Sequence, residues 1–453
     1  MTTIVANALA SRSGWTYLPE YAQETLPRYT SYPPANRFDA TVGAADAALA
    51  MRQLPSGSPL SLYIHVPFCR KLCWYCGCHT SVPTQADPVE DYLAALYREI
   101  ELIASNVSSD ATVANIHIGG GSPDILTPQQ VAKLFKTLRA SFHVSSFAEI
   151  AAELDPRGAT DQVVGGLADI GLTRASLGVQ VLDRKVQERI NRVQPTEEVD
   201  AVIRRLRRAG VDSLNIDMMY GLPGQTIEHV VETASFAGTR DADRIAVFGY
   251  AHVPWFKKHQ KSISTDELPS SEQRFRQAEA AARTLERAGY LPIGFDHFAA
   301  PGDSLVTAER RGELHRNFQG YTSDAATALI GFGASSISSL PGLIWQNTPD
   351  TAAYKAQLAE GKAPVVRGAR LSAEDQRIAR LIERLLCDFE ADIPTDLRIH
   401  ACPRLLPLQA AGLIEFVDNH LIITARGRPY ARNVAASFDP DFLGATQKHS
   451  LAV

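Results

Sequence analysis

The residues best suited to chemistry are four cysteines within ten residues: Cys69, Cys73, Cys76 and Cys78. They directly follow a strand-like run at residues 60–65. Thiolates held this closely on one loop must share a metal or a cluster, or else be redox-active. Structural zinc prefers paired C-x2-C elements from two places in the chain, and the other cysteines, Cys387 and Cys402, are distant and widely spaced. A disulfide pair suits small secreted domains, a class that this chain does not fit.

The first three thiols follow the spacing C-x3-C-x2-C, which is typical of radical S-adenosylmethionine enzymes. In that class, three thiolates bind three irons of a 4Fe-4S cluster. The fourth iron stays open for the amino and carboxylate groups of S-adenosylmethionine. We therefore interpret this segment as a cluster-binding loop, with a zinc knuckle and a disulfide pair as the alternatives.

Polar or glycine residues also end each of the predicted strands, where the catalytic groups of parallel α/β barrels collect. Successive glycines let the backbone approach a ligand closely. Acidic groups on apolar strands are costly to bury unpaired, so we expect them to accept hydrogen bonds from a ligand, ribose hydroxyls being a natural fit. The alternatives are a tight turn for the glycines, salt bridges for Glu153 and Asp217, and a surface helix position for Arg192. The strand ends carry Tyr63, His65, Gly119, Gly120, Gly121, Ser122, Glu153, Gln180, Asp217, Ala251 and His252.

An alternation of β-rich runs and helical patterns from residue 60 onward positions these residues. Start signals such as Thr127 before Pro128, and Ser270 with Gln273, mark helix beginnings. The alternation implies parallel pairing with right-handed crossovers. Six or seven such units favour a barrel or an open partial barrel over a small flavodoxin-like sheet, and the expected fold class is α/β, a partial (β/α)6 TIM-like barrel. The predicted strands are 60–65, 113–118, 149–154, 173–179, 213–219, 244–250 and 291–295. The predicted helices are 89–104, 128–141, 159–170, 196–209, 227–238 and 270–288.

The chain divides into four predicted segments: an N-terminal arm at 1–58, the barrel at 59–300, a glycine-rich extension at 301–364 that completes the active site, and a C-terminal module at 365–453. The arm is expected to be irregular, with one helix near 44–53. The module is predicted as helices at 373–386 and 402–411 followed by a hairpin of 413–417 and 421–424, which resembles a winged helix. Its 11 basic and 11 acidic residues give no basic footprint, so a cover over the barrel is favoured over DNA binding.

The composition is that of an ordinary globular protein, with 453 residues, 45% apolar and 21% charged. A net charge of −5 gives no general attraction to nucleic acid or to an anionic membrane. We find no secretory signal and no apolar run of about 18 residues, so no membrane insertion is expected. Clustered thiols without such a signal indicate the cytoplasm.

The chain resembles the oxygen-independent coproporphyrinogen III oxidases of haem biosynthesis from about residue 28 to the C-terminus. The fourth cysteine and the last of the matching motifs are specific to that family. The matching motifs are Arg28-Tyr-Thr-Ser-Tyr-Pro33, Tyr63-Ile-His-Val-Pro-Phe-Cys69, the loop ending in Gly77-Cys78, Asn215-Ile-Asp-Met-Met-Tyr-Gly-Leu-Pro223, Tyr250-Ala-His252 and Asn317-Phe-Gln-Gly-Tyr-Thr322.

The resemblance implies a role for each matching position. The cluster ligands would be Cys69, Cys73 and Cys76. Contacts to the S-adenosylmethionine on the open iron would be Tyr63, Gly120, Glu153 and Ile337. Contacts to a second S-adenosylmethionine would be Tyr75, Gly121, Ser122, Gln180, Arg192, Asp217 and Ala251. Two positions depart from the family, because Tyr75 replaces the usual phenylalanine and Ser122 the usual threonine.

The implied activity is oxidative decarboxylation of two propionates of coproporphyrinogen III to vinyl groups. In the implied mechanism, a reduced cluster cleaves S-adenosylmethionine to methionine and a 5′-deoxyadenosyl radical, which abstracts hydrogen from the propionate β-carbon. The resemblance further implies a flavodoxin or ferredoxin system as electron donor, a monomer, and no nucleic-acid partner. The alternatives are a haem-trafficking relative, a haem-degrading methyltransferase, a radical enzyme that modifies RNA or protein, and a zinc-binding protein.

Four thiolates could fill all four corners of a cluster and leave no open iron. The ligand-binding residues on the following strands favour an open iron, so we place Cys78 outside the cluster ligands, as a catalytic residue on the substrate side. The substrate bears four carboxylates, which require cationic partners. The candidates are Arg28, Lys257, Lys258, Lys261 and Arg316, with a solvated charged face as the alternative.

Overall fold

A computed structural model describes residues 15–85, 87–442 and 450–451 of the chain. The beginning of the predicted arm (1–14) and parts of the predicted C-terminal module (443–449 and 452–453) lie outside the described residues. Twelve strands form the main sheet in the order β15-β14-β13-β12-β2-β3-β4-β5-β6-β7-β9-β8. The pairings run from one edge strand to the other, so the barrel is a partial one, as predicted.

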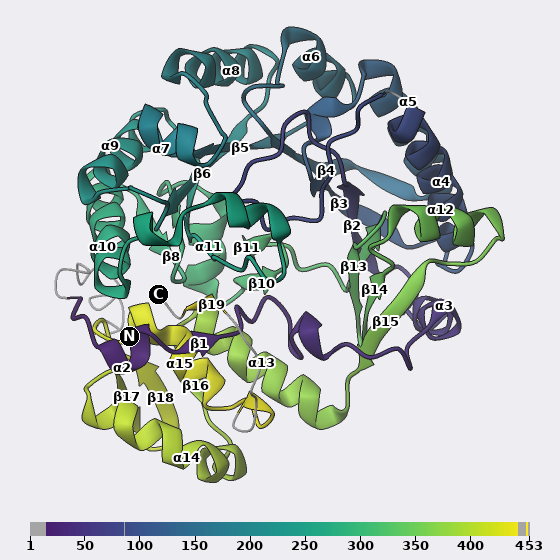
Figure 1. Ribbon diagram of the computed structural model, residues 1–453. Helices are drawn as coiled ribbons and strands as arrows, with labels where there is room; N and C mark the ends of the chain where they lie inside the picture. Colours follow the sequence, from purple (N-terminus) through teal and green to yellow (C-terminus); the bar gives the residue numbers. More distant parts are fainter. Residues whose placement is uncertain (1–14, 86, 443–449, 452–453) are drawn as a thin grey trace.

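The six predicted strand–helix units are confirmed, and their helices lie around the outside of the strands (Figure 1). The strands β2 to β7 are parallel throughout. Their bounds are β2 Pro59–Val66, β3 Thr112–Gly120, β4 His143–Leu154, β5 Arg174–Gln180, β6 Ser213–Tyr220 and β7 Arg244–Gly249. The helices are α4 Asp87–Ala104, α5 Pro128–Ser141, α6 Asp161–Asp169, α8 Thr196–Arg208, α9 Ile227–Gly238 and α10 Ser271–Arg287, with a short α7, Arg184–Arg189, before α8.

Local sequence signals explain where two of these helices begin. The Thr127 side chain accepts from the Gln130 amide while the Gln130 side chain accepts from the Thr127 amide, which caps α5. Ser270 and Gln273 form the same reciprocal pair before α10. Both pairs satisfy amides that the first helical turn leaves unpaired, as the sequence predicts.

The sheet continues beyond both predicted ends of the barrel. A seventh parallel strand, β12 (Ala328–Phe332), pairs with β2, and β13 (Ile337–Leu340), β14 (Leu343–Asn347) and β15 (Val365–Arg370) extend it antiparallel. The predicted strand at 291–295 is shorter, β8 (Leu291–Ile293), and pairs only with β9 (His297–Ala299), antiparallel. The expectation of a parallel unit there was wrong, because Gly294 to Asp296 turn the chain back.

Alternate residues of β2 to β6 face opposite sides, as expected for half-buried strands. On β2, Leu60, Leu62 and Ile64 are fully buried in the apolar core that includes the helices, whereas Ser61 lines the barrel interior. On β3, Ile116 and Ile118 are buried in the same core. Polar side chains such as Ser61 therefore face the interior, which fits a ligand cavity rather than a packed barrel core.

The segment from residue 300 to 322 closes one side of the barrel. Helix α11 (Ser304–Arg311) leads into the hairpin of β10 (His315–Asn317) and β11 (Gly320–Thr322). Helix α12 (Thr351–Ala359) packs on α4. None of the helices in the described residues is both long and apolar enough to cross a membrane.

The C-terminal elements pack against the β10–β11 hairpin and the N-terminal arm. They are α13 (Ala373–Cys387), β16 (Glu390–Asp392), α14 (Thr395–Ala410), β17 (Ile414–Val417), β18 (His420–Ile423) and α15 (Ala431–Ala436). The β17–β18 hairpin is confirmed. Helix α14 begins seven residues before the predicted start. Proline is typical of the first turn of a helix, but Pro403 lies inside this one. The predicted boundary at 365 separates β15 from the sheet to which it is hydrogen-bonded.

The arm is fixed by the C-terminal part of the chain. It contains α2 (Pro19–Ala22), β1 (Thr25–Leu26) and the predicted helix α3 (Ala44–Arg52), and β1 pairs with β19 (Ser450–Leu451). Arg37 binds both carboxylate oxygens of Asp439, and the Tyr29 hydroxyl donates to the same carboxylate at 3.0 Å. In Figure 1 the arm runs beside the C-terminal helices and strands. These contacts hold Arg28, the neighbour of Tyr29, at the barrel.

A buried carboxylate on α4, that of Glu99, binds residues from the segment that follows β12. Glu99 is 1% exposed and accepts hydrogen bonds from the Gly333 amide, Asn347 and the Tyr354 hydroxyl, all within 2.7 Å. Burial outweighs these bonds and raises its pKa to about 7. We expect Glu99→Ala to lower the free energy of unfolding by about 3 kcal/mol, because it leaves three buried donors unpaired. Urea unfolding tests this, with the exposed Glu101→Ala of the same helix as control; equal stability of the two variants would contradict it.

Candidate active site

The barrel interior contains a cavity of about 670 Å³. Its wall is formed by inward-facing residues of β2 to β7, by the cysteine loop and by the β10–β11 hairpin. Cys78 lines it, as do all the residues predicted to bind the cluster or S-adenosylmethionine except Tyr63 and Ile337. Those that line it are Cys69, Cys73, Tyr75, Cys76, Cys78, Gly120, Gly121, Ser122, Glu153, Gln180, Arg192, Asp217 and Ala251.

The two exceptions are not among the residues that line the cavity. The Tyr63 hydroxyl is 3.0 Å from His65 Nδ1, and its ring stacks on that of His117, with ring centroids 5.8 Å apart. Ile337 begins β13 and packs against the apolar cluster of Phe38 and Ile344. A ligand contact by either side chain stays a prediction.

The cysteine loop leaves β2 and is anchored by backbone hydrogen bonds at its base. The Cys69 amide donates to the Ser81 carbonyl and the Ser81 amide donates to the Pro67 carbonyl, at 2.9 and 3.0 Å. Cys69 Sγ lies 3.1 Å from Thr80 Oγ1. All six cysteines are free thiols, so the disulfide alternative is wrong.

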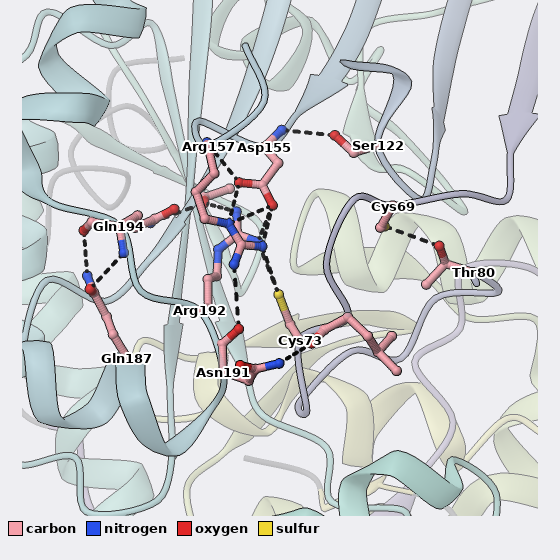
Figure 2. Close-up of polar contacts among 12 residues, drawn as sticks. Cys69, Cys73, Thr80, Ser122, Asp155, Arg157, Gln187, Asn191, Arg192 and Gln194 are labelled. Atoms are coloured by element: carbon pink, nitrogen blue, oxygen red, sulfur yellow. Dashed lines mark hydrogen bonds and ion pairs between the residues drawn. The ribbon is translucent and has the colours of Figure 1, made fainter. Parts of the chain in front are cut away.

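Cys73 is the buried thiol of the loop and lies within a network of charged groups (Figure 2). Its sulfur accepts from Arg157 Nη2 and Arg192 Nη1, each at 3.3 Å. Asp155 binds the same two guanidinium groups, at 2.6 and 2.9 Å. The Asn191 side chain also donates to the Leu72 carbonyl. Two guanidinium groups and one carboxylate thus surround the Cys73 sulfur.

A second segment holds the loop from its other side. Three side chains of the 3₁₀ helix η3 (Lys258–Ser262) and its N-cap bind three carbonyls of the loop. Gln260 donates to Tyr75, His259 to Cys76 and Lys257 to Cys78, at 3.0, 2.7 and 2.9 Å. Cys76 and Cys78 are thus fixed by a segment about 180 residues away in sequence.

The glycine turn after β3 leaves no room for side chains. Gly120 has φ +107°, and a Cβ at this position would lie 2.5 Å from the His65 ring. A Cβ on Gly121 would lie 2.3 Å from the Phe68 carbonyl oxygen. The turn therefore presses directly on the base of the cysteine loop, so a tight turn and a close backbone approach are both features of this site.

Glu153, at the end of β4, is ionised by its neighbours. Burial favours its neutral form, but hydrogen bonds from His117 Nε2 at 2.9 Å and from the Gly120 amide at 3.3 Å outweigh burial and keep its pKa below the usual value. His65 donates from Nε2 to the His79 carbonyl, and burial lowers its pKa to about 4. A neutral His65 therefore accepts from Tyr63 through Nδ1.

The ends of β5 and β6 carry polar groups with open hydrogen-bonding capacity. Asp217 accepts from Ser176 and Asn215, and burial raises its pKa. Gln180 has a positive φ of 68°, and its side-chain oxygen is buried without a hydrogen-bond partner. Arg192 Nε is also buried and unpaired. Buried polar atoms normally have partners, so these point to a polar ligand in the cavity.

Two of the five predicted substrate cations lie on the cavity wall. Arg28 and Arg316 line it, whereas none of the three predicted lysines does. The Arg316 side chain is 4% exposed and stacks on Phe295 at 4.6 Å, and its Nε and Nη1 have no hydrogen-bond partner. The nearest carboxylate is Asp296, whose Oδ1 is 3.8 Å from Nη1. Although burial opposes ionisation, Arg316 and His297 lower the pKa of Asp296 to about 2.

These features fit a cluster with an organic ligand. The three thiols border a shared cavity, and within the described residues no three His, Cys, Asp or Glu side chains gather around one position for a single metal ion. A four-iron cluster needs separated thiolates, and the unpaired atoms of Gln180 and Arg192 offer hydrogen bonds to a polar ligand.

Sequence reasoning missed several groups that position this site. Asp155 was visible as an acidic residue after the third strand, but its partners Arg157 and Arg192 were not paired with it. His117 and Asp296 gave no signal, because neither belongs to a recognisable motif. Their roles depend on strand pairing that brings distant residues together.

Comparison with known proteins agrees with this site. A family model described as the radical SAM superfamily matches residues 63–237. The chain is 42% identical to the oxygen-independent coproporphyrinogen III oxidase of Bradyrhizobium diazoefficiens, over 96% of this chain and 98% of that protein. For the enzyme of this name from Salmonella typhimurium the identity is 38%, over 91% and 92%. The solved structure of coproporphyrinogen III oxidase from Escherichia coli superposes with a TM-score of 0.88 at 37% identity and covers 91% of this chain and 97% of that one.

The partial barrel with three thiols at the end of its first strand defines a radical S-adenosylmethionine protein. Within that class, similarity over more than nine-tenths of the chain identifies the family. The chain belongs to the oxygen-independent coproporphyrinogen III oxidases.

Proposed function

We propose that this chain converts coproporphyrinogen III to protoporphyrinogen IX without oxygen, by oxidative decarboxylation of two propionates to vinyl groups. Two carbon dioxide molecules leave in this reaction. The observation that carries the proposal is one cavity lined by three cluster-type thiols and by the side chains of Arg28 and Arg316. The sequence similarity to coproporphyrinogen III oxidases supports the choice of substrate.

In this proposal, Cys69, Cys73 and Cys76 hold a 4Fe-4S cluster. Tyr63, Gly120, Glu153 and Ile337 orient one S-adenosylmethionine, and a second is held by the remaining predicted contacts. Those contacts are Tyr75, Gly121, Ser122, Gln180, Arg192, Asp217 and Ala251. When bound, the cluster and S-adenosylmethionine supply the one-electron reductive cleavage that yields a hydrogen-abstracting radical. The unpaired atoms of Gln180 and Arg192, and the ionised Glu153, provide hydrogen bonds that fix the polar ends of these ligands.

The substrate carboxylates are assigned to Arg28 and Arg316. A buried guanidinium with two unpaired atoms gains most from a carboxylate, which accepts two parallel hydrogen bonds. Cys78 acts near the substrate and outside the cluster ligands. We further propose that the enzyme is a cytoplasmic monomer that receives electrons from a flavodoxin or ferredoxin system, and that the C-terminal module serves as a cover.

Anaerobic turnover tests the proposed function. The reconstituted wild-type enzyme, with dithionite, S-adenosylmethionine and coproporphyrinogen III, is expected to form a product lighter by two carbon dioxide and two hydrogen molecules. Mass analysis of the product and of released 5′-deoxyadenosine measures both halves of the reaction. A reconstituted cluster without doubly decarboxylated product would overturn the proposal and favour a haem-trafficking role.

A further inference from the structure

The three lysines predicted as substrate ligands belong to a segment that is hydrogen-bonded to the cysteine loop. Lys257, Lys258 and Lys261 are absent from the cavity wall on which Arg28 and Arg316 lie. Lys258 and Lys261 are exposed, and neither lines the cavity. Their charges therefore serve a purpose other than the proposed one of binding the substrate inside the cavity.

These lysines share a short segment with two exposed aromatic side chains. Trp255 is 57% exposed and Phe256 is 74% exposed, and Lys257 Nζ lies 5.2 Å from the centre of the Phe256 ring. We call residues 255–261 the loop-clamp surface. It contains three lysines and no acidic residue. The nearest acids that follow in sequence are Asp266 and Glu267, and Glu267 is already paired with Arg189 at 3.2 Å.

The loop-clamp surface is bonded directly to the cluster loop. The hydrogen bonds of Lys257, His259 and Gln260 to the carbonyls of residues 78, 76 and 75 leave no intervening layer of protein. A protein that docks on Trp255 and Phe256 therefore comes close to the three thiols. Exposed aromatic side chains are enriched at protein interfaces, and charged residues around them attract a partner of opposite charge.

We propose that the loop-clamp surface is the docking site of an acidic one-electron carrier protein of the flavodoxin or ferredoxin type. The occupant is chosen by charge, because three lysines on a chain of net charge −5 form a local positive surface that attracts an acidic partner and repels a basic one. In the step served, the reduced carrier loses one electron and the cluster held by Cys69, Cys73 and Cys76 gains it; no bond forms or breaks. The inference rests on the proposed function, which requires one-electron reduction.

A small interface suffices for this role. Complexes between redox proteins bury little surface and rely on charge to speed association. Two lysines and one aromatic side chain therefore contribute measurably to the binding affinity. We expect Lys258→Glu/Lys261→Glu to weaken binding of a purified bacterial flavodoxin at least tenfold at low ionic strength. Phe256→Ala is expected to weaken it several-fold with little change in salt dependence.

Titration calorimetry with the reconstituted enzyme and flavodoxin measures binding without turnover. The matched control is Lys133→Glu/Lys136→Glu, which makes the same charge change on exposed residues of α5. The activity driven by dithionite is expected to stay within twofold of wild type in both double variants, because dithionite needs no docking site. Flavodoxin-driven activity should fall only in the Lys258/Lys261 variant.

Equal flavodoxin affinity in the two double variants, or no saturable binding by the wild type, overturns the docking proposal. A parallel loss of dithionite-driven activity in Lys258→Glu/Lys261→Glu also overturns it and returns these lysines to substrate binding. Failure of the proposed function has a different signature: the wild type then forms no decarboxylated product with dithionite, whatever the flavodoxin affinity is.

Discussion

Cys73→Ala is expected to lose the cluster, with iron content below about one-tenth of wild type after anaerobic reconstitution and no detectable decarboxylation. Three thiolates hold the cluster in the proposed arrangement, and Cys73 is the buried one, with Arg157 and Arg192 beside its sulfur. A methyl group offers neither a ligand nor an acceptor for these guanidinium groups. Iron and sulfide analysis, with the absorbance of the reconstituted cluster, measures the loss.

Cys78→Ala is the matched comparison within the same loop. Cys78 is exposed, and its position is set through its carbonyl by Lys257, which the substitution leaves in place. We expect this variant to keep the iron content of wild type and to lose decarboxylation. The distant, exposed Cys402→Ala should change neither quantity. Loss of iron in both loop variants would mean that Cys78 is a cluster ligand.

Arg316→Ala is expected to lower kcat/KM for coproporphyrinogen III about 100-fold, which corresponds to about 2.8 kcal/mol. The reason is the environment of the guanidinium, which is buried between Phe295 and Tyr321 and has two nitrogen atoms without a hydrogen-bond partner. Removal of one partner of a desolvated charge pair costs a few kcal/mol. Arg316→Lys should recover only part of the loss, because an ammonium cannot form two parallel bonds to a carboxylate.

Steady-state kinetics of both Arg316 variants with dithionite as reductant provide this test. The control is Arg310→Ala, an exposed position in the last turn of α11. Iron content should equal wild type in all three variants, since Arg316 is not a cluster ligand. Unchanged kcat/KM in Arg316→Ala would place the substrate carboxylates elsewhere in the cavity.

Local patterns predicted the six strand–helix units because each contains its own signal. The reciprocal capping of Thr127 with Gln130 and the alternation of apolar and polar residues on β2 are legible over a few residues. Strand β12 carries no comparable signal, since its five residues include a glycine and its identity depends on pairing with β2, more than 260 residues earlier. The antiparallel turn at β8 and β9 depends likewise on tertiary pairing.

The parts of the site that depend on the spacing of residues in the sequence could be predicted. The parts that depend on three-dimensional contacts could not. The C-x3-C-x2-C spacing and the polar strand ends led to residues that share one cavity. Charge alone could not separate Arg316, inside the wall, from Lys258, outside the loop, because both are cations near matching motifs. The hydrogen bonds of His259 and Gln260 to loop carbonyls could not be predicted either, because every residue has a backbone carbonyl and the sequence does not show which one accepts.

The bond between Arg37 and Asp439 has a consequence for the order in which the enzyme is built. These residues are 402 positions apart, and translation adds about 5–20 residues per second, so Asp439 follows Arg37 by roughly 20–80 s. During that interval the cysteine loop has left the ribosome, but the segment that carries Arg28 has no anchor. The thiols of the nascent chain are thus exposed before the cavity wall is complete. Chaperones or oxidants can reach them before the substrate can bind.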